Sequence, residues 1–319
     1  MSSNQHIIAI DTSNYTTSVA LMTADGELLA NLKRPLKVKE GERGLRQSDA
    51  VFAHTVNLPE IMREMAQLFP NISPVAVGVS EKPRNESGSY MPCFLSGVSA
   101  ATAIAATCGV PLYGFSHQCG HIMAAIYSSG AYELLAEGEF VAFHLSGGTS
   151  EFVSVKPTGV DFKTEILGGT ADLNAGQVID RIGVYMGFSF PAGKEIELSA
   201  LTNTKKIPKR KISKKGLTFN LSGLENMAIS LFSETNDKAL TSAFVLDYIA
   251  RSIISICEEY EAGHGKTKFL FAGGVMCNSI IKTMISEKFD AYFAEPMLSA
   301  DNAVGIAALA QRRYETERR

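Results

Sequence analysis

Two histidines four residues apart are the residues in this chain best suited to chemistry. They lie in the stretch Ser116-His117-Gln118-Cys119-Gly120-His121, which is followed by the apolar run 122–126. Ser116 is a good N-cap, so the sequence predicts a helix that begins at His117. Residues four apart lie one turn above each other on one helix face, so both imidazoles can reach a single metal ion.

The same stretch argues against peptide hydrolysis. A zinc protease with this spacing carries a glutamate directly after the first histidine as general base, and here Gln118 stands in that position and cannot accept a proton. Cys119 points to another side of the helix and is not expected to bind the same ion. A catalytic metal site needs a third ligand from elsewhere in the chain. Because the chain has six histidines, two hydrogen-bonded helix residues that bind nothing are the alternative.

The composition describes an ordinary globular protein of 319 residues with 45% apolar residues, long enough for two domains or one two-lobed fold. The net charge of −3 gives no general attraction to nucleic acid or membranes, so any basic surface has to be local. Five cysteines without Cys-x-x-Cys spacing favour a reduced, cytoplasmic setting. The N-terminus has a strand pattern instead of a signal peptide, and we expect no membrane-spanning segment.

A pattern of strand, polar turn, strand, turn and strand occurs twice. Its expected strands cover residues 6–11, 18–22 and 27–32, and then 140–145, 151–156 and 162–167, with polar turns at 12–17 and 146–150. The duplication predicts two similar α/β lobes around a cleft, and two unrelated hairpins are the alternative. Further strands are expected at 75–80, 268–272 and 291–294, and helices at 51–68, 97–108 and 278–287. Ser299 or Asp301 can cap a terminal helix that reaches about residue 313.

Two glycine turns each follow a predicted strand. Ser146-Gly147-Gly148-Thr149 offers bare backbone N–H groups and hydroxyls that can approach a phosphate. Gly273-Gly274-Val275 precedes a predicted helix, whose N-terminus can face an anion. Either turn alone is more often a simple turn, but the pair favours a nucleotide cleft. Asp180 and Asp301 are candidate ligands or hydrogen-bond acceptors.

One segment is strongly basic. Residues 205–215 read Lys-Lys-Ile-Pro-Lys-Arg-Lys-Ile-Ser-Lys-Lys, with seven basic residues and no acid. Such a segment can neutralise several phosphates of an RNA. A solvated loop is the plainer alternative.

These stretches together resemble one protein family. The motifs, in chain order, are Ile-Asp-Thr-Ser (10–13), His-Gln-Cys-Gly-His (117–121), Leu-Ser-Gly-Gly (145–148), Ala-Gly-x-x-x-Asp (175–180), Phe-x-Leu-Ser-Gly-Leu (219–224), Ala-Gly-Gly-Val-x-x-Asn (272–278) and Asp-Asn (301–302). This set resembles the TsaD/Gcp family of tRNA threonylcarbamoyladenosine biosynthesis proteins, formerly labelled O-sialoglycoprotein endopeptidases. The resemblance implies a duplicated actin-like, hexokinase-like ATPase fold in the α/β class, with two lobes around a central nucleotide cleft.

The resemblance also implies the lobe boundaries and the reaction. Residues 1–114 would form the N-terminal lobe, with the C-terminal helix 301–319 packing back on it, and residues 115–300 the C-terminal lobe. Family members transfer a threonylcarbamoyl group from threonylcarbamoyl-AMP to N6 of adenosine in tRNA. They work with TsaB-like and TsaE-like partner proteins in the cytoplasm, and a dimer through a lobe face and no membrane association are expected.

Site residues follow position by position from the same resemblance. His117, His121 and Asp301 match the ligands of one divalent metal ion per subunit, iron or zinc. The donor, threonylcarbamoyl-AMP, or ATP as the adenine nucleotide, would be bound by these residues: His144, Leu145, Ser146, Gly147, Gly148, Asp180, Gly193, Glu197 and Asn278. Asp11 and Ser146 are the candidate catalytic residues.

Three short stretches depart from the family pattern. Tyr15 and Thr16 stand where bacterial members carry an acidic pair, Thr149-Ser150 replaces a His-Thr or Asn-Thr pair, and Gln177 replaces a glutamate. A divergent paralogue with another acceptor, an ATPase or kinase of the same fold, and a non-catalytic scaffold subunit are therefore the alternatives. Because fold alone does not separate these functions, the retained histidine pair is what favours the metal-dependent transferase.

Overall fold

The structure is a computed structural model that describes residues 5–13, 15–37, 45–136, 138–298 and 301–318. The chain forms two compact units, and each is described by itself. The first comprises Met1–Tyr132, Pro157–Lys163 and Met297–Arg319, and the second comprises Glu133–Lys156 and Thr164–Pro296. The expected boundary at residue 114 differs from this division, because the helix that carries the histidines packs against the C-terminal helix and belongs to the first unit.

The first unit is built on a sheet that has, among the described residues, five strands in the order β3-β2-β1-β4-β5. The strands are β1 (His6–Asp11), β2 (Thr16–Thr23), β3 (Leu28–Pro35), β4 (Pro74–Lys82) and β5 (Leu112–Ser116). β1 pairs antiparallel with β2 and parallel with β4, which places it inside the sheet. This explains why its sequence is a continuous apolar run without alternation.

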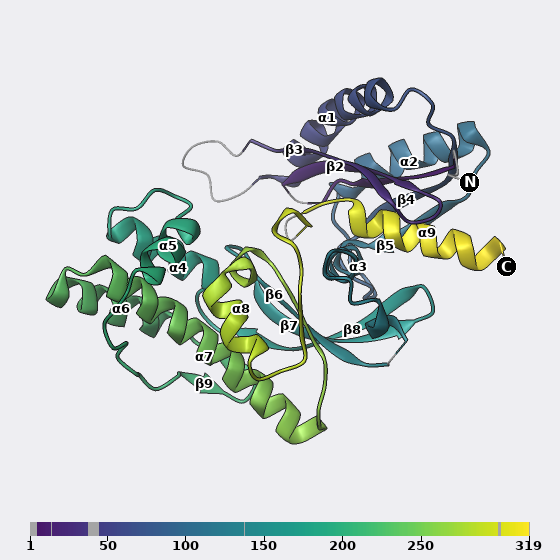
Figure 1. Ribbon diagram of the computed structural model, residues 1–319. Coiled ribbons are helices and arrows are strands. Elements are labelled where there is room, and N and C mark those ends of the chain that lie inside the picture. The colour runs from purple at the N-terminus through teal and green to yellow at the C-terminus, as the bar shows by residue number, and fades with distance from the viewer. Residues whose placement is uncertain (1–4, 14, 38–44, 137, 299–300, 319) are drawn as a thin grey trace. The chain divides into compact units, whose positions relative to one another are not determined.

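Helices cover both faces of this sheet (Figure 1). They are α1 (Gln47–Leu68), α2 (Phe94–Cys108), α3 (His117–Ser129) and α9 (Val304–Arg318). α1 and α2 share a core cluster with side chains of β1, β2 and β4, whereas α9 lies against the same strands from the other side. α9 approaches β4 closely, because a Cβ added at Gly78 would lie 2.9 Å from the Cβ of Ala310.

α3 and α9 pack together at two glycines. A Cβ at Gly305 would lie 1.8 Å from the backbone oxygen of Gly120, and a Cβ at Gly120 would lie 2.8 Å from Ile306. Atoms cannot approach so closely, so only glycine permits this backbone contact at Gly305. The contact brings the start of α9, and the residues just before it, to the first turn of α3.

The second unit contains, within the described residues, a seven-stranded sheet in the order β12-β11-β6-β7-β8-β10-β9. Its strands are β6 (Phe140–Leu145), β7 (Ser150–Thr158), β8 (Asp161–Thr170), β9 (Lys214–Lys215), β10 (Thr218–Phe219), β11 (Phe269–Ala272) and β12 (Ala291–Phe293). Phe152, Phe143, Phe271 and Phe293 face one another across four neighbouring strands, with ring centroids 4.8–5.0 Å apart. This stacked row of aromatic rings ties β7, β6, β11 and β12 together.

The helices of this unit pack around α7 (Figure 1). They are α4 (Ala175–Tyr185), α5 (Gly193–Leu201), α6 (Ser222–Thr235), α7 (Lys238–His264) and α8 (Ser279–Ser286), and short 3-10 turns cover Tyr132–Leu135, Gly274–Cys277 and Pro296–Leu298. α7 is long and apolar enough to cross a membrane by length and composition alone, which the sequence analysis did not anticipate. Its apolar window is 89% buried inside the protein, as in a core helix.

The expected strands and three internal helices are present with small shifts of their ends. α9 runs further than expected, to Arg318, and the side chain of Asn302 accepts a hydrogen bond from Val304 N–H at its start. Asn302 therefore binds the first residue of α9, and Ser299, one of the two residues expected to cap this helix, lies outside the described residues. Asn14, in the expected 12–17 turn, also lies outside them.

The contact between α3 and α9 is testable by Gly305→Ala. The added methyl group meets backbone atoms that cannot move independently, so we expect the free energy of unfolding to fall by about 1–3 kcal/mol. Denaturant unfolding followed by circular dichroism measures the change. Gly263→Ala is the matched control, because nothing lies within 4 Å of that position in α7 and alanine favours a helix by up to about 1 kcal/mol. Equal unfolding midpoints for Gly305→Ala and the wild type would show that α3 and α9 do not make a close backbone contact at Gly305.

Candidate metal centre and nucleotide-binding residues

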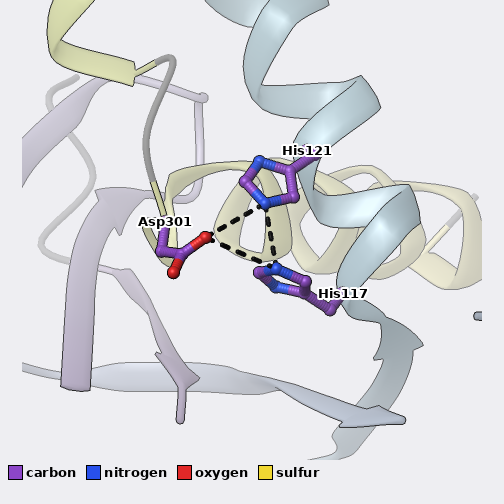
Figure 2. A group of neighbouring side chains, drawn as sticks. All are labelled: His117, His121 and Asp301. Carbon is purple, nitrogen blue, oxygen red and sulfur yellow. Dashed lines mark hydrogen bonds and ion pairs between the residues drawn. The ribbon is translucent and has the colours of Figure 1, made fainter. Parts of the chain in front are cut away.

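The first turn of α3 presents both histidines toward one point (Figure 2). Ser116 is the N-cap, as expected, and its Oγ accepts a hydrogen bond of 3.2 Å from Cys119 N–H. The Nε2 atoms of His117 and His121 lie 2.9 Å apart, and both rings are half-buried. Cys119 is fully buried and lies near Asn85 and the backbone oxygen of Phe162, so it does not face the histidines.

Asp301 completes a group of three. Its Oδ1 lies 3.6 Å from Nε2 of His117 and 3.3 Å from Nε2 of His121. Nitrogen or oxygen ligands of a tetrahedral zinc ion lie about 3.3 Å apart, given bonds of about 2.0–2.1 Å. The three donor atoms are therefore spaced as the ligands of one ion would be, and they are the only His, Cys, Asp or Glu cluster of this kind in the described part of the chain.

Asp11 binds the ring nitrogen of His117 that does not face Asp301. Its Oδ2 lies 2.8 Å from Nδ1 of His117, and its Oδ1 accepts hydrogen bonds from the hydroxyl of Ser80 and the backbone N–H of Ser13. A carboxylate at Nδ1 holds a proton there, so a metal ion would bind at Nε2 in place of the second proton of the charged ring. Asp11 is only 1% exposed, so it acts on the site through His117.

The electrostatics of the group favour a positive charge. Burial alone would lower the pKa of His117, but the carboxylates of Asp11 and Asp301 raise that pKa to about 10. Burial alone would likewise raise the pKa of Asp301, yet His117 and His121 hold it well below its usual range. Two carboxylates thus surround two imidazoles, and the negative potential at their centre suits a divalent cation.

A fully buried histidine, His54, lies on α1. His54 shares the buried face of that helix with Ala50, Leu58 and Ile61, and its Nδ1 lies 2.8 Å from the hydroxyl of Thr17. Asn57 donates to the same hydroxyl, so the Thr17 proton points to His54. Burial lowers the pKa of His54 to about 4, against a weaker opposing effect of Asp11. His54 was not predicted from the sequence, although its spacing within the apolar positions of α1 indicates a core side chain.

The candidate nucleotide-binding residues lie in the second unit and form two groups. The first is the turn after β6, in which the Ser146 hydroxyl accepts from Gly148 N–H and Thr149 N–H. Gly176, at the start of α4, donates to Ser146 O, and a Cβ there would lie 2.6 Å from Gly147 N. The N–H groups of Gly148 and Thr149, which were expected to face a phosphate, therefore form hydrogen bonds inside the turn. The proposed catalytic role of Ser146 stays a prediction.

His144 and Leu145 precede this turn at the end of β6, where His144 is half-buried and Leu145 is buried. Gly273 has φ +95° and lies directly beside them, because a Cβ there would lie 2.2 Å from the oxygen of Leu145. Both glycine turns thus follow a strand, as the sequence predicted, and the structure adds that these strands, β6 and β11, are neighbours in one sheet.

The second group joins three helices. Asp180 on α4 accepts from Ala192 N–H, next to Gly193 at the start of α5. Glu197 on α5 accepts from the backbone N–H and the hydroxyl of Ser279 at the start of α8. Asn278 is the N-cap of α8 and accepts from Ile280 N–H and Ile281 N–H. The structure therefore brings together Asp180, Gly193, Glu197 and Asn278. The side chains of Glu197 and Asn278 bind the N-terminus of α8.

One departure from the family pattern now has a structural reason. Gln177 is the third residue of α4 and forms a capping box with Asn174, in which the Gln177 side chain accepts from Asn174 N–H. Glutamine and glutamate both perform this role. Gln177 therefore keeps the capping interaction that a glutamate would make at this position.

Solved structures with a similar arrangement define the class of fold. HypF from T. kodakarensis matches 98% of this chain and 48% of its own, with a TM-score of 0.61 and 14% identity. Full-length HypF in a phosphate- and nucleotide-bound form has a TM-score of 0.59 at 11% identity, covering 97% of this chain and 55% of its own. The fold is α/β and of the actin-like, hexokinase-like ATPase class, as expected.

Sequence comparison narrows the class to a family. The family model described as TsaD, tRNA N6-adenosine threonylcarbamoyltransferase, matches residues 31–308. The enzyme of that name from Streptococcus suis (strain 05ZYH33) is 30% identical over 99% of this chain and 95% of its own length. The one from Halalkalibacterium halodurans is 27% identical over 99% and 93%. The chain therefore belongs to the TsaD family and is an enzyme of its transferase class.

The pKa of His54 generates a prediction about acid stability. An unfolded histidine takes up a proton below about pH 6.5, whereas folded His54 does so only near pH 4, so the unfolded state gains stability as the pH falls through this window. The contribution of His54 is complete above pH 6.5 and is lost toward pH 4, with a slope of at most about 1.4 kcal/mol per pH unit. Urea unfolding of the wild type and His54→Gln across this range measures the slope. Parallel curves would show that His54 is not neutral in the folded protein.

Proposed function

We propose that the chain transfers a threonylcarbamoyl group from threonylcarbamoyl-AMP to N6 of adenosine in tRNA, with a metal ion bound by His117, His121 and Asp301. The observation that carries this proposal is the convergence of these three donors in a chain of the TsaD family. The residues fit the ion, because their donor atoms are spaced as metal ligands and two carboxylates offset its charge.

A divalent ion held there, iron or zinc, would polarise a carbonyl and stabilise negative charge on its oxygen. The bonds that form and break lie between the two substrates. The adenine amine forms the new C–N bond to the carbamoyl carbon, the C–O bond breaks with its electron pair leaving on the phosphate of AMP, and the amine releases one proton to the solvent. Asp11 is a positioning residue in this scheme, which replaces the catalytic role expected for it, because its buried carboxylate keeps the Nδ1 proton on His117.

Binding of the donor falls to the second unit. Its AMP part would be held by residues 144–148, by Asp180 and Gly193, and by Glu197 and Asn278. The hydrogen bonds that these residues make to one another hold their backbone in place before a nucleotide binds, and such preorganisation lowers the cost of binding. TsaB-like and TsaE-like proteins are the proposed partners.

The transfer is tested by incubating the purified protein with threonylcarbamoyl-AMP, tRNA and the partner proteins, and by analysing the nucleosides by mass spectrometry. We expect modified adenosine with the wild type and a loss of at least about 100-fold for His117→Ala and His121→Ala, since each removes a ligand. His264→Ala, a histidine at the end of α7, is the control and should keep full activity. Unmodified adenosine with the wild type would exclude the proposed reaction, and release of inorganic phosphate from ATP would favour an ATPase or kinase.

The role of Asp11 is tested by Asp11→Asn. The amide has the same size but no charge to hold the Nδ1 proton of His117, so we expect metal affinity to fall about 10–100-fold. Calorimetric titration of the metal-free protein with zinc measures this affinity without an activity assay. Asp49→Asn, an exposed residue on α1, is the control. Unchanged zinc affinity in Asp11→Asn would mean that Asp11 does not position His117.

A further inference from the structure

The basic segment that the sequence analysis singled out lies in the second unit, and the metal centre and the nucleotide residues leave it without a role. Residues 203–216, named here the basic strap, leave the end of α5 without regular structure and reach β9 (Figure 1). Three of its lysines bind acids of α7 or of its N-cap. Lys205 pairs with Asp237 at 2.8 Å, Lys209 with Asp247 at 2.5 Å, and Lys214 with Glu259 at 2.5 Å.

The strap runs along α7 in the same direction as the helix. Extended chain between Lys209 and Lys214 spans about 17 Å, and the helix axis between Asp247 and Glu259 spans about 18 Å. The strap and α7 therefore advance by nearly the same distance between these two ion pairs. Tyr248 adds hydrogen bonds, donating from its hydroxyl to Lys211 O and accepting there from Ser213 N–H.

Apolar contacts also hold the strap in place. Ile207 and Ile212 are half-buried and pack on the hydrophobic core of the unit. Asp247 is 4% exposed and binds Arg251 as well as Lys209. The strap is therefore attached to the helix at several points, unlike the solvated loop that was the plainer alternative.

The remaining basic side chains point outward. Lys206, Arg210, Lys211 and Lys215 are exposed, and in the described part of the chain their side chains form no ion pair or hydrogen bond. The strap thus uses some of its charges to bind α7 and presents four others in a row roughly 30 Å long. A row of cations on an attached, extended backbone matches a polyanion with regularly spaced charges, which is the chemistry of a phosphodiester chain.

We propose that the basic strap binds the ribose-phosphate backbone of the tRNA substrate, an inference that rests on the proposed function for the identity of the RNA. Contacts of this kind hold and orient a nucleic acid without reading its bases. The strap would therefore contribute affinity for any tRNA, and selection of the modified adenosine would come from other residues.

The test measures binding of fluorescently labelled tRNA by anisotropy at several salt concentrations. One variant carries Lys206→Gln, Arg210→Gln, Lys211→Gln and Lys215→Gln. The control carries Arg63→Gln, Lys156→Gln, Lys163→Gln and Lys282→Gln, which remove the same charge from exposed positions outside the strap. Circular dichroism and thermal unfolding verify that both variants are folded.

We expect the strap variant to bind tRNA at least tenfold more weakly near 0.15 M salt. A plot of log K against log salt has a negative slope, and its magnitude should decrease by about 3 in the strap variant. Each phosphate that the strap no longer neutralises accounts for roughly 0.7–0.9 of that magnitude. The control should stay within about twofold of the wild type. Equal affinity and slope for the strap variant and the control would overturn the proposal. So would poly-glutamate binding as tight as tRNA binding with the same salt slope, because the strap would then be a site for acidic protein.

A separate readout distinguishes this proposal from the proposed reaction. His117→Ala leaves the strap intact and should bind tRNA like the wild type. If tRNA binds through the strap but adenosine is never modified, the reaction is wrong and the strap assignment stands. If adenosine is modified and the strap variant has the wild-type KM for tRNA, the strap assignment is wrong and the reaction stands.

Discussion

The candidate metal centre depends on one backbone contact between two helices that are far apart in the sequence. Gly120 on α3 and Gly305 on α9 leave no room for a side chain between them. This contact sets the distance from the first turn of α3 to the residues that precede α9, and so places Asp301 within 3.6 Å of both histidine rings. The glycines therefore matter to the chemistry although neither carries a functional group, and a side chain at Gly305 would move a ligand as well as the helix.

The parts of this centre that local sequence determines were predictable. Ser116, the spacing of His117 and His121, and the apolar run after them all act within one helix, so the helix and its cap followed directly from residue types. The position of Asp301 depends on packing between distant segments, and only resemblance to a family indicated it. α7 was missed for a different reason, because it is buried on nearly all sides and lacks the periodic pattern by which a surface helix is detected.

Polar residues that bind other parts of the chain were the hardest to interpret from sequence. Asp11 ends an apolar strand and was expected to be catalytic, but its burial and its hydrogen bond to His117 support a positioning role. Glu197 and Asn278 were expected to bind a nucleotide, which stays a prediction, and in the structure both bind the N-terminus of α8. Gln177 departs from the family pattern but keeps the capping interaction of a glutamate. In each case the partner comes from another element or from the residues before the helix, so the residue type alone left its role open.

We propose that His117, His121 and Asp301 bind one metal ion through two Nε2 atoms and one carboxylate oxygen. The most direct measurement is a crystal structure of the zinc-loaded protein with data collected on both sides of the zinc absorption edge. The account predicts one strong anomalous peak per chain, about 2.0–2.2 Å from these three donor atoms. A peak elsewhere, or zinc bound by other side chains while the three donors remain hydrogen-bonded to one another, would contradict it.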